Sequence, residues 1–108
     1  MAYPTPDDPR QAPTWTNHVV AQASQAALGL VPSYVHALGV RVDGFDVTLV
    51  VQAPHGSPAD RDQDVVDIAE DLRAFLGPDA HVATEVQASE TRRLDTHDGV
   101  RWFFATRA

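Results

Sequence analysis

Six acidic side chains fall within twelve positions of the stretch PADRDQDVVDIAEDL, residues 58–72. They are Asp60, Asp62, Asp64, Asp67, Glu70 and Asp71. Carboxylates at this density can bind calcium, exchange protons in catalysis, attract a cationic partner or keep a helix face hydrated. A calcium-binding EF-hand loop needs glycine at its sixth position for a sharp turn. Counted from Asp60, that position holds Val65, so the stretch does not predict a calcium site.

The acidic stretch instead has the pattern of an amphipathic helix over residues 58–76. Ser57 is a natural N-cap, Pro58 suits the first helical position, and Gly77 follows the last turn. At 100° per residue, four of the aspartates fall within about 60° of one another on this helix. We call them the acidic ridge: Asp60, Asp64, Asp67 and Asp71.

Helix electrostatics explains only the first half of the acidic ridge. Negative charge near a helix N-terminus is stabilising by roughly 0.3–1 kcal/mol, but Asp67 and Asp71 lie too far along to benefit. Like charges four residues apart destabilise a helix by roughly 0.2–0.5 kcal/mol per pair. Two interpretations stay open. The ridge is a solvated face, or it is a docking surface for a cationic partner, with contacts at Asp60, Asp64, Asp67, Glu70 and Asp71.

No motif predicts a reaction, and we therefore predict no catalytic residue, no metal and no cofactor. Carboxylates on an open ridge keep ordinary pKa values, whereas general acid–base catalysis needs a cleft that shifts them. A nucleophile elbow, a glycine-rich phosphate loop and metal-type histidine spacing are all missing from the sequence. The alternative is a small ligand-binding or accessory enzyme domain. Its site would lie between the loops that hold His55, His97, Asp98 and Arg101.

Composition narrows the class of partner. The net charge is −7, with eight arginines and no lysine. That balance argues against nucleic acid and anionic membranes, whose binding needs a basic surface. It permits a basic protein partner, or serves solubility alone. No segment approaches the roughly 18 apolar residues that span a bilayer.

Residues 1–13 carry four prolines and no apolar run, so we expect a flexible tail there and a single domain over residues 14–108. Cysteine is absent, which fits a reducing compartment, and we expect a cytoplasmic protein.

The elements that would position these residues can be predicted from periodicity. Residues 15–28 have helical spacing, and residues 81–89 and 100–107 alternate as strands. Two alternating runs flank Asp43-Gly44, which predicts a hairpin with that pair as its loop. The expected pairs are Val42 with Phe45, Val40 with Val47, and Leu38 with Leu49.

The element order is α-β-β-α-β-β. It predicts an α+β fold, a two-layer sandwich with two helices on one face of a four-stranded, mainly antiparallel sheet. The strand order is not predicted.

The last strand suggests a second contact surface. Alternation in RWFFATR places Trp102 and Phe104 in the core and exposes Phe103 among charged residues, where it would serve as an interface anchor. Small residues at Ala37, Gly39 and Ala105 leave room on the sheet face opposite the helices. The tail, a partner or a second copy of the chain in a homodimer would fit there.

Three segments resemble the small acidic immunity proteins of bacterial polymorphic and contact-dependent toxin systems. They are AALGLVPSYVHALGVRVDGFDVTLVVQ, SPADRDQDVVDIAEDLRAFL and GVRWFFATR, within residues 24–107. The resemblance implies a non-enzymatic, stoichiometric inhibitor that masks a basic toxin domain, often a nuclease. It also implies that the acidic second helix is the docking element.

Overall fold

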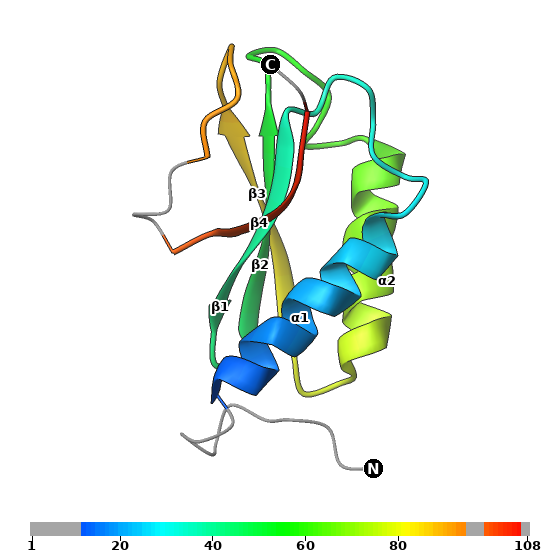
Figure 1. Cartoon of the computed structure of the whole chain (residues 1–108). Helices are drawn as coiled ribbons and strands as arrows, with labels where there is room; N and C mark the ends of the chain where they lie inside the picture. Colours follow the sequence, from blue (N-terminus) through cyan, green and yellow to red (C-terminus); the bar gives the residue numbers. More distant parts are fainter. Residues whose placement is uncertain (1–11, 95–98, 107–108) are drawn as a thin grey trace.

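The computed structural model describes residues 12–94 and 99–106. The elements are α1 (Ala12–Ala27), β1 (Ala37–Asp43), β2 (Asp46–Ala53), α2 (Gln63–Leu76), β3 (His81–Ala88) and β4 (Arg101–Ala105). Both helices pack on one side of a single four-stranded sheet (Figure 1). The predicted α+β class and its two layers are confirmed.

The sheet has the strand order β3-β2-β1-β4. β1 pairs antiparallel with both β2 and β4, whereas β2 and β3 are parallel. Parallel neighbours need a crossover connection, and α2 supplies it. β3 and β4 therefore lie at opposite edges of the sheet, and the chain after β3 must pass across the sheet to reach β4.

The β1–β2 hairpin forms, but its loop lies one residue later than predicted. Asp43 pairs with Asp46 and Val40 pairs with Leu49, so the loop is Gly44-Phe45. Gly44 has a φ of 60° at the first loop position, which a type II′ turn assigns to glycine. The predicted loop would have required a positive φ at Asp43 as well. Because the pairing shifts by two residues, every side chain stays on its predicted face.

The core lies between the helices and the sheet. Its fully buried side chains include Val19, Leu38, Leu49, Ile68 and Leu72. At the start of α1, the Trp15 indole N–H donates to the Gly44 carbonyl at 2.8 Å, and its ring meets Phe45 edge-on at 5.7 Å. These contacts attach the first helix to the hairpin loop.

Helix α2 begins five residues later than predicted, because Asp62 rather than Ser57 is its N-cap. The Asp62 side chain accepts from the Asp64 N–H at 2.8 Å and from the Tyr34 hydroxyl at 2.6 Å. Burial and the bond to Asp62 raise the pKa of Tyr34 above its ordinary 10.0. The Tyr34 bond lowers the pKa of Asp62. Residues 58–61 form a turn, and Asp60 lies in it.

A bulge in β4 overturns the predicted alternation there. Leu38 pairs with Phe104, but its neighbour Gly39 pairs with Trp102, which leaves Phe103 as the extra residue. Phe103 and Phe104 are both partly buried against the core on the helix side. Trp102 pairs with Gly39, and its side chain lies on the other face of the sheet. The predictions that Trp102 fills the core and that Phe103 is exposed are therefore wrong.

The chain covers part of the second face of its own sheet. Residues 89–94, which we call the crossing segment, lie on the side away from the helices (Figure 1). The amide of Gln52, a residue only 2% exposed, accepts from the Arg93 N–H and donates to the Arg93 carbonyl, both at 2.6 Å. Val100 lies over Gly39 so closely that a Cβ there would be 2.5 Å from Val100 Cγ1. The room left by Gly39 is filled by this chain itself.

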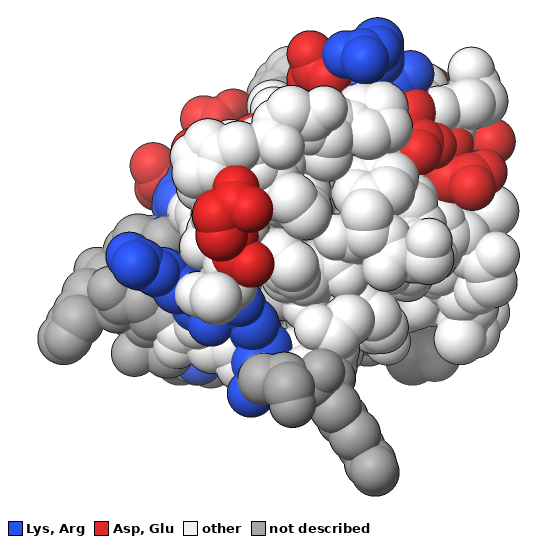
Figure 2. Space-filling model, turned by 90° about the horizontal axis from the view of Figure 1, so that it is seen from above, with Lys and Arg blue, Asp and Glu red and all other residues white. Residues whose placement is uncertain are grey.

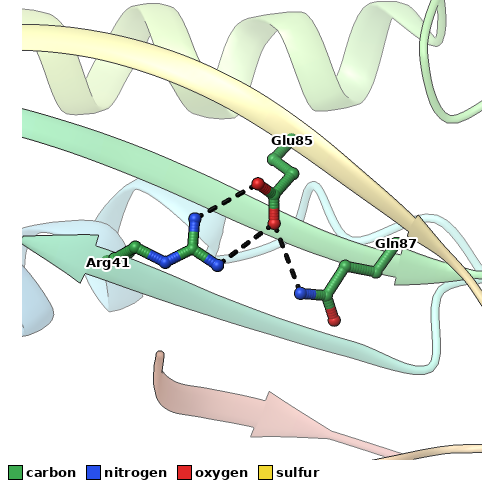
Figure 3. A network of polar contacts seen from close by, with 3 residues as sticks. All are labelled: Arg41, Glu85 and Gln87. Atoms are coloured by element: carbon green, nitrogen blue, oxygen red, sulfur yellow. Dashed lines mark hydrogen bonds and ion pairs between the residues drawn. The ribbon is translucent and has the colours of Figure 1, made fainter. Parts of the chain in front are cut away.

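The remaining open face carries an ion pair within the chain. Arg41 on β1 donates two hydrogen bonds to Glu85 on β3, both at 3.2 Å (Figure 3). The Gln87 amide donates to the same carboxylate at 3.3 Å. Arg41 and Glu85 on this face are thus paired with each other within one chain.

Candidate functional site

The acidic ridge is only partly assembled by α2. Asp64, Asp67 and Asp71 lie on the helix, while Asp60 lies in the preceding turn and pairs with Arg61 at 3.3 Å. Glu70 pairs with Arg73 at 2.8 Å, and Asp67 accepts from Gln63 at 2.8 Å. Exposed pairs of this kind are worth roughly 0–1 kcal/mol and separate readily.

Asp64 and Asp71 differ from the other acids of α2. Both are exposed, and neither side chain makes a hydrogen bond or ion pair with another described residue. Asp64 lies in the first turn, where the helix N-terminus favours it, but Asp71 gains nothing from that end. Seen from one end of the molecule, the acidic residues form separate groups with arginines among them rather than one continuous patch (Figure 2).

A second candidate site is a cavity of about 620 Å³ on the open face of the sheet. It lies at the carboxyl ends of the parallel strands β2 and β3. This position is between the two loops in which the alternative site was predicted. Its polar and aromatic lining includes Gln52, His55, Gln87, Glu90, Arg93 and Trp102. Ligand sites are concavities of about 300–1,000 Å³ with a few convergent polar groups, and this cavity falls within that range.

His55 and Glu90 form the closest polar pair in the cavity. Glu90 Oε1 lies 2.5 Å from His55 Nδ1 and accepts from the His55 backbone N–H at 3.1 Å. The side-chain bond first, and then the backbone bond, lowers the pKa of Glu90. Glu90 is therefore ionised near neutral pH, and the bond places the imidazole proton on Nδ1.

The structure brings together only some of the residues predicted for the alternative site. His55 lines the cavity, whereas Arg101 lines a neighbouring hollow of about 390 Å³ with Leu94 and Trp102. His97 and Asp98 lie outside the described residues. Gln52 and Glu90 were missed, although a glutamine inside an apolar strand was a usable signal. Trp102 was missed because the bulge reverses its face.

Phe103 borders a different cavity, of about 380 Å³, at the end of α1. Leu28, which is 68% exposed, and Phe104 also line it. Phe103 is not exposed among charged residues as predicted, since it packs toward the helices.

Comparisons with protein-family models, with curated proteins and with solved structures found no match. Across residues 12–94 and 99–106, no helix combines the length and apolar character that crossing a membrane requires. The same residues contain no group of three or more potential ligands that could hold a metal ion.

Proposed function

We propose that this chain is a non-enzymatic binding protein that docks a basic protein partner on the outer face of α2. The resemblance noted above gives the role a definite form, that of an immunity protein that neutralises a basic toxin domain, such as a nuclease, in the cytoplasm. The observation that carries the proposal is the pair Asp64 and Asp71, exposed and without a partner among the described residues. The charge on Asp71 does not stabilise the fold, because it lies too far from the helix N-terminus and has no partner among the described residues.

Apolar exposure beside the acids supports a docking surface. Phe75 lies one turn beyond Asp71, on the same side of the helix, and is 43% exposed. Protein interfaces obtain most of their affinity from a few such buried anchors, and aromatic residues are enriched among them. The surrounding carboxylates would steer a cationic partner toward the helix and raise the association rate.

Charge reversal on α2 tests the proposal. The variant Asp64→Lys, Asp67→Lys, Asp71→Lys should fold, because it breaks only the exposed Gln63–Asp67 bond. The first partner to test is a basic domain encoded beside the gene for this chain. We expect the reversal to weaken its binding at least tenfold, measured by calorimetry at fixed ionic strength.

A matched control separates the helix face from net charge. Asp43→Lys, Asp46→Lys, Asp79→Lys reverses three exposed aspartates near the hairpin loop and changes the net charge equally. It should retain most of the affinity. Equal losses in the two variants, or no loss in either, would remove α2 as the docking surface.

A further inference from the structure

The cavity on the open face is a candidate site independent of α2. We propose that it binds a small zwitterionic ligand, an α-amino acid with an apolar side chain. In this arrangement Arg93 binds the carboxylate, Glu90 binds the ammonium group, and Trp102 contacts the side chain.

The wall of the cavity is fixed by a buried polar contact. Gln52 is the one buried polar side chain among the described residues, and both ends of its amide bond the backbone of Arg93. A buried amide is tolerated only when its hydrogen bonds are satisfied. Gln52 therefore holds the crossing segment against the sheet at Arg93 and fixes the position from which the Arg93 side chain extends.

Two opposite charges are available on this lining. The Arg93 guanidinium makes no hydrogen bond or ion pair with another described residue, and a guanidinium can bind a carboxylate through two parallel bonds. Glu90 Oε1 is occupied by His55, while Oε2 accepts from no other described residue. A ligand with only a negative charge would meet the Glu90 carboxylate in the same cavity. A ligand with only a positive charge would meet Arg93.

His55 acts here as a positioning residue. Its backbone N–H and its Nδ1 both bond Glu90 Oε1, so the carboxylate is held by two contacts from the loop after β2. The second oxygen, Oε2, is then left for the ligand.

The aromatic lining selects the rest of the ligand. Trp102 is partly exposed and borders the cavity, which gives an apolar surface beside the charged groups. Tryptophan offers a large area for stacking or edge contacts with an apolar group. The 620 Å³ volume accommodates a free amino acid with an aromatic or branched side chain.

Titration of the ¹⁵N-labelled protein with L-phenylalanine, followed by NMR, tests the proposal. We expect saturable shifts at the Trp102 indole and at the Glu90 and Arg93 amides, with a Kd of about 1 mM or tighter. Two analogues serve as controls: 3-phenylpropanoate lacks the ammonium group, and phenethylamine lacks the carboxylate. Each should bind at least tenfold more weakly.

Variants assign the two charges. Arg93→Gln and Glu90→Gln should each reduce L-phenylalanine binding at least tenfold, while Arg61→Gln, in the turn before α2, should leave it unchanged. Arg93→Gln should keep the wild-type melting temperature, because the exposed Arg93 side chain bonds no other described residue, whereas Glu90→Gln weakens the exposed contact with His55 and should lower the melting temperature only slightly. The proposal is overturned if neither L-phenylalanine, L-tryptophan nor L-leucine gives a saturable shift. It is also overturned if the singly charged analogues bind as tightly, or if both glutamine variants bind normally.

Discussion

Two residues, Gln52 and Gly39, determine how the chain covers the open face of its sheet. The Gln52 side-chain amide bonds the backbone N–H and carbonyl of Arg93, as a neighbouring strand would do. Gly39 lets Val100 and Arg101 lie close to β1. A Cβ at position 39 would collide with the Val100 side chain and would lie 2.9 Å from the Arg101 carbonyl oxygen. Gly39 was identified from the sequence as a gap in the face, but the sequence does not show which segment fills it.

Replacement of Gln52 should release the crossing segment. Gln52→Leu removes both bonds and leaves the Arg93 N–H and carbonyl without their partners, which costs about 1–3 kcal/mol of unfolding free energy. Chemical denaturation measures the loss, and hydrogen exchange at the Arg93 amide should become faster. Gln25→Leu, at an exposed position on α1, is the control and should change neither quantity. Wild-type stability and unchanged exchange in Gln52→Leu would show that the contact does not hold the segment.

At the scale of the elements, the features that depend on local sequence pattern were predicted correctly or nearly so. The features that depend on distant contacts were found at other positions than predicted. The hairpin follows from Gly44 and from alternation, which are local, so only its loop moved. The start of α2 depends on Tyr34, 28 positions before Asp62, and no local capping rule includes that contact. The face of Trp102 depends on a bulge that is defined only by pairing with β1.

The Tyr34–Asp62 bond predicts a pH-dependent contribution to stability. The pKa of Asp62 is lowered from its ordinary 3.8, so the ionised form is favoured by folding. The contribution is present above pH 3.8 and is lost as the pH falls through the lower, folded-state value. Tyr34→Phe should therefore be less stable than the wild type at neutral pH, and the difference in melting temperature should shrink in acid.

Ser57→Ala should match the wild type across the same pH range, because Ser57 does not cap α2. A difference between Tyr34→Phe and the wild type that stays constant down to pH 3 would contradict the role of Asp62 ionisation.

At the scale of the whole molecule, the layers were predictable and the strand order was not. Two amphipathic helices must cover one sheet face, and this follows from apolar periodicity alone. The parallel β2–β3 pair depends on which edge α2 returns to, and both edges were compatible with the sequence. The same topology brings the ends of β2 and β3 together with Trp102 on β4. A cavity therefore lies between the two loops named for the alternative site, although His55 is the one described residue named there that lines it.

The surface of the whole molecule carries the proposed function. Because this chain has a net charge of −7, it attracts any basic protein at long range. Attraction alone therefore does not identify a docking site. A specific docking face is identified by the positions at which a change of charge alters the association rate. Charges near the contact accelerate association far more than equal charges elsewhere.

The association rate constant with the basic partner domain is therefore the most direct test. Stopped-flow measurements at about 10 mM and about 300 mM salt span strong and weak screening. We predict that the wild type and the Asp43, Asp46, Asp79 control associate rapidly at low salt and slow at least tenfold at high salt. We predict that the Asp64, Asp67, Asp71 reversal is slow at both. Equal rate constants for the two reversal variants at low salt would contradict docking on α2.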